Sequence, residues 1–422
     1  MESAAVVILA ILVFLFAIFS GRLARSPVSG PMLFVTAGIL LGSAGLSWVT
    51  TEVGDGIMQF VLEITLALVL FTDATDVSLR TLRDEVPLSS RLLGIGMPIT
   101  MVVGGGLAAV LFTDLEFWEG MLVGVMLAPT DAALGQAVVA NRRVPARIRQ
   151  ALTVESGLND GLALPIFSVV LAIAEVEFEA SPRIFIEIGV DLVIAIAAGV
   201  IVGYLAGVAM AFATERGWVG DAWRSIGPAA VAIGLFAATD LSGLSGFIAA
   251  FVGGIFFGHA TRERVPGVAV FSEGAAHLLT MLSFFVFGAA IFGPIIGDLT
   301  WPIVGYALLS LTIIRMVPVA LSLIGTDLEW RTVGYLGWFG PRGLASIVFM
   351  TILVLEAELP GKPTMVLVVA ATVALSVYLH GATAWWGSNH YASWYESMGE
   401  EMEDMTESGA VSLEVRRSRL EM

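Results

Sequence analysis

A short polar segment stands out in an otherwise apolar stretch of the chain. Residues 152–161 read LTVESGLNDG and place Glu155, Ser156, Asn159 and Asp160 within six positions. On a helix that turns about 100° per residue, these four side chains lie on one side. Carboxylate, amide and hydroxyl oxygens are hard ligands, which suit a hard cation better than a transition metal. The segment therefore predicts a binding site for a small alkali ion.

Three acids and two arginines lie inside apolar runs: Asp131, Glu155, Asp160, Arg315 and Arg342. A charge at bilayer depth costs at least about 2.5–3.5 kcal/mol, so such residues indicate function by default. Structural ion pairs are the alternative interpretation, but they leave one of the three carboxylates without a basic partner. A buried carboxylate of that kind either holds a proton or binds a cation. A site that does one or the other is the site of an exchanger.

The composition of the chain is that of an integral membrane protein. Of its 422 residues, 57% are hydrophobic and only 14% are charged, and the mean hydropathy is +0.89. A soluble domain is about a quarter charged. The chain has no cysteine and only four scattered histidines, so we expect no bound metal cofactor and no other cofactor. A net charge of −16 argues against nucleic acid as a partner.

Thirteen apolar runs are long enough, or nearly so, to cross a bilayer, which takes about 20 mostly apolar residues. They lie at 3–20, 28–48, 57–75, 87–112, 117–140, 150–174, 184–214, 225–241, 243–259, 272–296, 301–324, 332–355 and 363–386. The eighth and ninth are short and are separated only around TDLSGLSG. We therefore predict an all-α polytopic membrane domain over residues 1–386. The remainder, 387–422, is interpreted as a short, solvated, acidic cytoplasmic tail.

Basic residues orient these spans. Seventeen of the 21 arginines and lysines fall in the odd-numbered loops or the tail, whereas only Arg183 and Lys362 fall in the even-numbered loops. Basic loops face the cytoplasm. We therefore expect a multi-pass protein of the cell membrane with its N-terminus outside and its C-terminus in the cytoplasm.

Two of the spans contain helix-breaking residues in mid-membrane. Span five reads VGVMLAPTDAALGQAVV around Pro129, and span twelve reads YLGWFGPRGLASIVF, with Gly340, Pro341 and Gly343 around Arg342. Interrupted helices at matching positions of two halves indicate the midplane site of a transporter. Seven spans separate the pair, and this odd number predicts two repeats inverted in the membrane.

The motifs LAPTDAAL, ESGLNDG about 20 residues later, and WFGPRGLASIVF resemble those of the NhaP/NHE-type monovalent cation:proton antiporters. The resemblance extends over residues 1–386. It implies an NhaA/NhaP-like fold, a homodimer in the lipid bilayer, and exchange of Na⁺ or Li⁺ for H⁺. Such a protein is a transporter and not an enzyme.

The same resemblance implies roles for individual residues. Asp160 would alternate between a cation and a proton, while Asp131 and Thr130 would complete or polarise the site. Ser156 and Asn159 would add oxygen ligands or hold Asp160 in place. The Na⁺ ligands would thus include Asp160, Asp131 and Ser156.

Glu155 would form an intramembrane ion pair with Arg342 or Arg315, and the sequence leaves that choice open. An asparagine before Asp160, where other members of the superfamily have a second aspartate, implies electroneutral exchange of one cation for one proton.

Several alternatives remain at this level. A K⁺/H⁺ antiporter of the same fold is the nearest, followed by a cation channel and an intramembrane hydrolase with two catalytic aspartates. In span three, Glu63 and Asp73 could belong to an ion pathway. We favour instead the interpretation that Asp73 and Asp76 cap the end of that helix beside Arg80.

Overall fold

The computed structural model describes residues 3–23, 26–49, 56–76, 86–131, 134–175, 182–262, 264–265, 267–399 and 406–407. Within these ranges the regular structure is helical throughout, with no strand. Seven of the described helices are long and apolar enough to cross a membrane, and four shorter helices are also apolar.

The prediction of an all-helical fold is confirmed, and each of the thirteen apolar runs contains one helix or a series of helical segments. The first half comprises α1 (Ser3–Leu23), α2 (Gly30–Leu41), α3 (Gly56–Asp76), α5 (Val86–Arg91), η1 (Leu92–Gly96), α6 (Met97–Leu111), α7 (Phe117–Met126), α8 (Gln136–Val139), α9 (Ala146–Glu175) and α10 (Pro182–Glu215). Here α5, the π-helical η1 and α6 together make span four, and α7 and α8 are the two parts of span five.

The second half begins after α10. It comprises α11 (Asp221–Asp240), α12 (Gly246–Thr261), α13 (Val270–Val286), η2 (Phe287–Phe292), α14 (Gly293–Ile295), η3 (Ile296–Asp298), α15 (Trp301–Leu311), α16 (Ile313–Ser322), α17 (Trp330–Trp338), α18 (Leu344–Glu356) and α19 (Lys362–Ser397). The helices α11 and α12 are separate, so the short eighth and ninth runs are indeed two spans.

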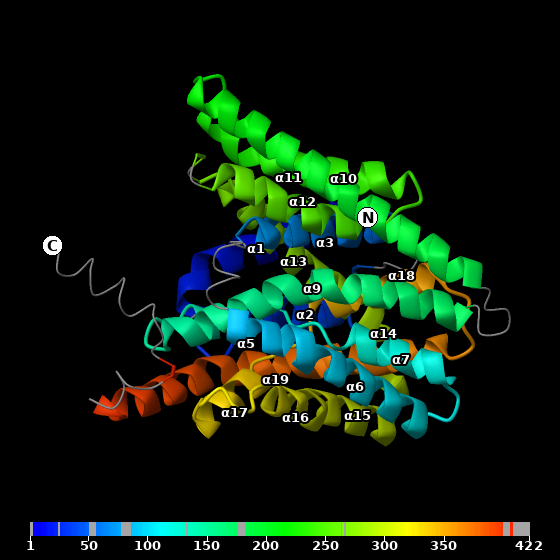
Figure 1. Ribbon diagram of the computed structural model, residues 1–422. Coiled ribbons are helices and arrows are strands. Elements are labelled where there is room, and N and C mark those ends of the chain that lie inside the picture. The colour runs from blue at the N-terminus through cyan, green and yellow to red at the C-terminus, as the bar shows by residue number, and fades with distance from the viewer. Residues whose placement is uncertain are drawn as a thin grey trace.

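The helices form layers (Figure 1). Helices α10, α11 and α12 lie together on one side, with α3 and α13 beneath them; we call these five helices the panel. Helices α5 to α9 and α15 to α19 form the opposite part, which we call the site bundle. Helix α9 lies at the boundary, because it contacts α7 in the site bundle and both α3 and α12 in the panel. The polar segment of span six is therefore placed between the two parts.

Close packing within the panel depends on glycines. Gly199, Gly203 and Gly207 recur every four residues on α10 and face α12. A Cβ on Gly203 would collide with the carbonyl oxygen of Gly253. Small residues at this spacing allow two helix backbones to approach closely in a membrane. The glycines thus bring the two backbones into direct contact.

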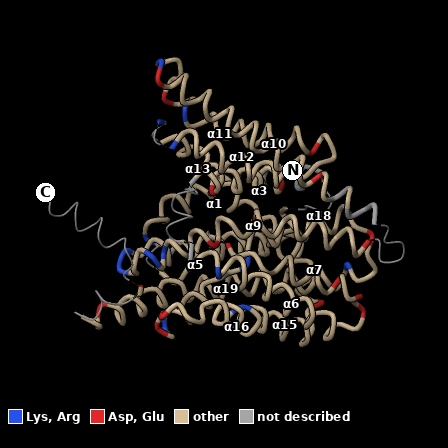
Figure 2. The backbone as a smooth tube through the Cα atoms, viewed as in Figure 1, with Lys and Arg blue, Asp and Glu red and all other residues tan. Residues whose placement is uncertain are grey.

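Charge is segregated along the helix axes (Figure 2). Most of the arginines lie at one end of the bundle, on the left of the figure, and the opposite end is mainly acidic. We call the first end the basic end. The basic residues Arg25, Arg80 and Arg83 and the tail arginines lie outside the described residues.

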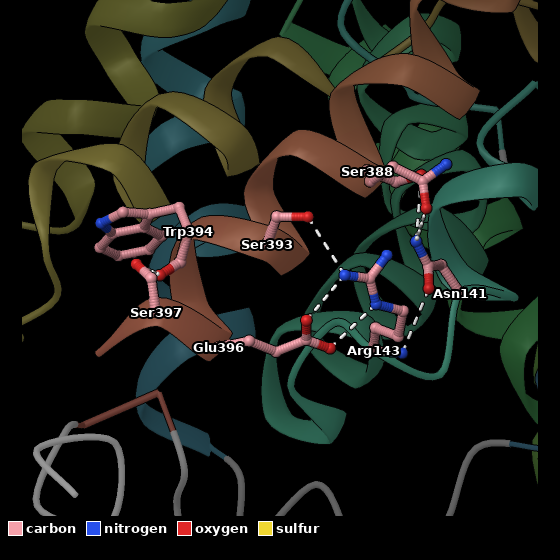
Figure 3. Close-up of polar contacts among 8 residues, drawn as sticks. Asn141, Arg143, Ser388, Ser393, Trp394, Glu396 and Ser397 are labelled. Atoms are coloured by element: carbon pink, nitrogen blue, oxygen red, sulfur yellow. Dashed lines mark hydrogen bonds and ion pairs between the residues drawn. The ribbon is translucent and has the colours of Figure 1, made fainter. Parts of the chain in front are cut away.

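At the basic end, the loop before α9 is tied to the last turns of α19 (Figure 3). Arg143 donates from Nε and Nη2 to the two carboxylate oxygens of Glu396, at 2.9 and 2.7 Å, and from Nη2 to Ser393 Oγ at 3.1 Å. The hydrogen bond from Arg143 lowers the pKa of Glu396 below its usual range. Helix α19 therefore continues, unbroken and anchored, past the domain boundary predicted at residue 386.

A second contact involves the acidic tail. Glu407 is buried, and its Oε1 accepts hydrogen bonds from the backbone N of Glu329 at 2.9 Å and from Thr332 Oγ1 at 2.7 Å. The first N–H groups of a helix have no hydrogen-bond partner within the helix. The Glu407 carboxylate is such a partner at the start of α17. The expectation of a solvated tail is therefore wrong for this residue.

We predict that Gly203→Ala destabilises the protein, by about 1–3 kcal/mol for an overpacked methyl group. Gly189→Ala is the matched control, because it lies on the same helix and a Cβ there has nothing within 4 Å. Thermal unfolding of the two purified variants in detergent tests this. Equal midpoints would show that the α10–α12 contact is not as tight as described.

Candidate functional site

The two interrupted helices meet at their breaks. Helix α7 ends at Met126 before α8 resumes at Gln136, and α17 ends at Trp338 before α18 begins at Leu344. The backbone N of Asp131 in the first break donates to the carbonyl oxygen of Pro341 in the second, at 2.8 Å. Each break contains a proline, which cannot continue a helix interior without losing a hydrogen bond. The breaks therefore cross in the middle of the site bundle.

Arg342 lies at the carboxyl end of α7. Its Nη1 donates to the carbonyl oxygens of Ala128 and Pro129, at 2.7 and 3.2 Å. The carboxyl end of a helix carries a partial negative charge. Arg342, which lies in the break between α17 and α18, therefore offsets the partial negative charge at the carboxyl end of α7.

Asp131 interacts with the opposite kind of helix end, the amino end. Its Oδ2 accepts from the backbone N of Leu344 at 2.7 Å, where α18 begins, and its Oδ1 accepts from the backbone N of Leu134 at 3.3 Å, just before α8. An acid is stabilising at these positive helix ends. A Cβ on Gly343 would collide with Asp131 Oδ2, so the approach requires glycine there.

Glu155 pairs with Arg315. Arg315 Nη2 lies 2.5 Å from Glu155 Oε1, and the two side chains are only 1% and 3% exposed. The structure thus answers the choice that the sequence left open between Arg315 and Arg342. A Cβ on Gly340 would collide with the Arg315 guanidinium, so the glycine in the second break also makes room for this pair.

The remaining polar residues of α9 converge on the first break. Asn159 Nδ2 donates to Thr130 Oγ1 at 2.5 Å and to the Thr130 carbonyl oxygen at 3.4 Å. Thr130 Oγ1 lies 3.3 Å from Ser156 Oγ. The structure therefore brings Thr130, Ser156 and Asn159 together, with Asp160 next to Asn159 on the same helix.

Asp160 differs from the other acids of the site. The residue is partly exposed, but its Oδ1 is buried and has no hydrogen-bond partner within the described ranges. Asp131 and Asp73 are close enough to act on it electrostatically. A buried polar atom without a partner is costly. Binding a proton or a cation would remove that cost.

Asp73 lies close to α9. It lies in the last turn of α3 and so resembles a helix-capping residue, whereas its supposed neighbour Arg80 lies outside the described residues. In the structure, a Cβ on Gly157 would lie 3.7 Å from Asp73 Cβ. Gly157, a small residue inside the polar motif of α9, was the sequence signal that another helix approaches there.

Where the structure describes side chains, no group of three histidine or acidic residues is arranged to hold a metal ion. A cation at Asp160 would therefore rely on hydroxyl, amide and backbone oxygens as well as the carboxylate. Such neutral oxygens are hard ligands, suited to alkali and alkaline-earth ions.

Comparison with solved structures gives the same fold. The structure of the sodium proton antiporter MjNhaP1 from Methanocaldococcus jannaschii matches with a TM-score of 0.72 and 20% sequence identity, over 91% of this chain and 96% of that one. This likeness establishes the NhaP-type arrangement of helices for the chain.

Relatives in sequence point the same way. The K⁺/H⁺ antiporter NhaP of Alkalimonas amylolytica is 27% identical over 82% of this chain, and a probable Na⁺/H⁺ antiporter of Schizosaccharomyces pombe is 27% identical over 63%. The chain spans about 60% of the length of the first of these and 36% of the second.

The family model described as "Sodium/hydrogen exchanger, transmembrane" matches residues 8–386, which include both interrupted helices and the whole of α9. The chain therefore belongs to the sodium/hydrogen exchanger family.

Proposed function

We propose that the protein is a secondary antiporter that exchanges Na⁺ or Li⁺ for H⁺, with the cation and the proton competing for Asp160. The observation that carries this proposal is the buried Asp160 Oδ1, which has no hydrogen-bond partner within the described residues and directly follows Asn159, the residue that binds Thr130. A transporter of this kind is not an enzyme.

Charge balance supports a stoichiometry of one to one. Glu155 and Arg315 neutralise each other, while Arg342 and Asp131 each offset a helix end. Among the charged residues of the two breaks and of the polar motif on α9, Asp160 is then the acid left to take up a charge. Replacing one cation by one proton on Asp160 keeps the net charge of the site constant.

The ligands follow from the same contacts. Asp160 supplies the charged oxygen. Ser156, one helical turn earlier on α9, and Thr130, which contacts both Ser156 and Asn159, supply uncharged oxygens. Both Asp131 oxygens accept backbone hydrogen bonds, but a carboxylate has about four acceptor positions in all, so Asp131 can still contribute to cation binding. Asn159 holds Thr130 in place.

K⁺/H⁺ exchange is the second candidate for the transported ion. The relative from Alkalimonas amylolytica is named as a K⁺/H⁺ antiporter, whereas that from Schizosaccharomyces pombe is named as a probable Na⁺/H⁺ antiporter. The ligand oxygens described here are compatible with either ion.

We further propose that the basic end faces the cytoplasm of the cell membrane, because arginine and lysine mark that side. The panel would form a homodimer, since α10 carries a row of exposed apolar side chains that includes Ile194, Ile201 and Leu205.

The first test of the proposal is Asp160→Asn in liposomes that hold an imposed pH gradient, with the voltage clamped at zero. Na⁺, Li⁺ and K⁺ are added in turn. We expect the wild type to dissipate the gradient and Asp160→Asn to lose this activity, because its amide cannot bind a proton. Asp298→Asn, a change of an exposed acid in η3 outside the panel, is the matched control.

The outcomes separate the candidates. Dissipation by K⁺ alone would retain the mechanism and change the ion. An unimpaired Asp160→Asn variant would refute the proposed role of Asp160, and cation currents far above carrier rates would indicate a channel.

Competition at one carboxylate also predicts the pH dependence. In the acidic range, the apparent KM for the cation should rise about tenfold for each unit by which the pH falls, because each bound proton excludes one cation. Initial exchange rates at several cation concentrations, measured from pH 5 to 8, test this. A KM independent of pH would contradict a shared site.

The buried pair predicts a stability effect. Arg315→Met alone should cost about 3–5 kcal/mol because it leaves Glu155 buried without its counter-charge. The double variant Glu155→Gln, Arg315→Met should recover much of that loss. Arg143→Met, which breaks the exposed pair with Glu396, should shift the unfolding midpoint little. A double variant no more stable than Arg315→Met would contradict this account.

A further inference from the structure

Ser376 contacts the second break from helix α19. The backbone N of Arg342 donates to Ser376 Oγ at 2.6 Å, and both residues are fully buried. The contact joins residues from different helices, unlike most serine and threonine hydroxyls in this bundle. Thr372, one turn earlier on α19, bonds only to the carbonyl oxygen of Val368 within its own helix at 2.7 Å.

The peptide groups around Arg342 depend on such external partners. The carbonyl oxygen of Pro341 accepts from Asp131 N, and the backbone N of Leu344 donates to Asp131 Oδ2. The backbone N of Arg342 is satisfied from outside the breaks, by Ser376. Irregular backbone at membrane depth persists only where its polar groups find partners.

A corresponding contact exists at the first break. Asn159 on α9 binds Thr130, the residue that directly follows Pro129, and Ser376 on α19 binds Arg342, the residue that directly follows Pro341. Each anchor lies on the span that follows the interrupted one. The two anchors thus occupy equivalent places in the inverted repeats, although one is an amide and the other a hydroxyl.

The geometry points to Ser376 as a positioning residue of the cation site, an inference that rests on the proposed antiport. Ser376 fixes the backbone of Arg342, and Arg342 Nη1 holds the carbonyl oxygens of Ala128 and Pro129. Those two residues lead directly into Thr130. A shift of the Arg342 backbone therefore moves the residues that lead into Thr130, which is bound by Asn159 next to Asp160 on α9.

The surroundings of Ser376 keep its hydroxyl in this role. His380 Nδ1 lies 3.1 Å from Ser376 Oγ, and the His380 ring packs against the Trp338 ring with centroids 5.0 Å apart. His380 Nδ1 also lies 3.1 Å from the Ser376 carbonyl oxygen, to which it donates when it carries a proton, and when it carries none it can accept from the Ser376 hydroxyl. In both tautomers Ser376 Oγ remains able to accept from Arg342 N.

The test compares Ser376→Ala with Thr372→Val, which removes a hydroxyl of the same helix that contacts neither break. We expect Ser376→Ala to raise the apparent KM for Na⁺ at least about threefold, with a smaller change in maximal rate. Thr372→Val should leave KM unchanged. A purely structural role would lower the amount of folded protein without altering KM.

Hydrogen exchange provides a readout that does not depend on transport. Backbone amides of residues 339–344 should exchange faster in Ser376→Ala, and not in Thr372→Val, because the Arg342 N–H loses its acceptor. If the wild type shows no cation-dependent proton movement, the antiport proposal fails, whereas this comparison still tests the contact itself.

Unchanged KM and unchanged amide exchange in Ser376→Ala would overturn the inference, as would equal effects in Thr372→Val. If Ser376→Ala does not fold, Ser376→Cys replaces it, because a thiol keeps the shape but is a weak acceptor. It should shift KM and amide exchange in the same direction, and wild-type values for both would also overturn the inference.

Discussion

Two helices stop and restart in the middle of an apolar bundle, and their free backbone groups must find partners there. Arg342 satisfies the carboxyl end of α7, and Asp131 satisfies the amino end of α18. Asn159 and Ser376 secure the residues after the two prolines. Because water does not hydrogen-bond these groups at membrane depth, each contact is required, and the surrounding glycines make room for the charged side chains.

The two halves are related by an inversion, but their chemistry differs at equivalent positions. Thr130 and Asp131 follow the first proline, whereas Arg342 and Gly343 follow the second. The first half thus contributes the acid Asp131 and the second half the base Arg342. Gly343 in the second break contacts Asp131, where a Cβ would collide with the carboxylate. These charges are matched to helix ends and to each other. Within the described residues the Oδ1 of Asp160 on α9 has no such partner, and in the proposed antiport this carboxylate takes up the exchanged charge.

Much of this arrangement follows from the sequence. The apolar runs predict thirteen helical segments. Pro129 and Pro341 predict the positions of the breaks, because a proline interrupts a helix at its own position whatever the rest of the fold. The partner of Glu155 did not follow, since Arg315 and Arg342 lie in adjacent spans and only packing distinguishes them. Asp73 does lie in the last turn of α3, but its approach to α9 did not follow from the sequence, because which helix lies beside α9 is a property of the fold. Ser376 carried no signal at all, because a serine in an apolar helix usually bonds within that helix, as Thr372 does.

The opposed directions of the two half-helix pairs have a consequence for the direction of transport. A pair entering from one face of the membrane meets a pair entering from the other, so the helix directions at the crossing are alike when viewed from either side. The crossing therefore favours neither face, and in the proposed antiport the ion gradients alone would set the direction of net exchange. The two ends of the bundle differ in their contacts, with Arg143 bound to Glu396 and Glu407 bound to α17 at the basic end, and Glu119 bound to the backbone N of Gly361 at the other end. A different response from the two sides of the membrane would have its physical origin in such differences.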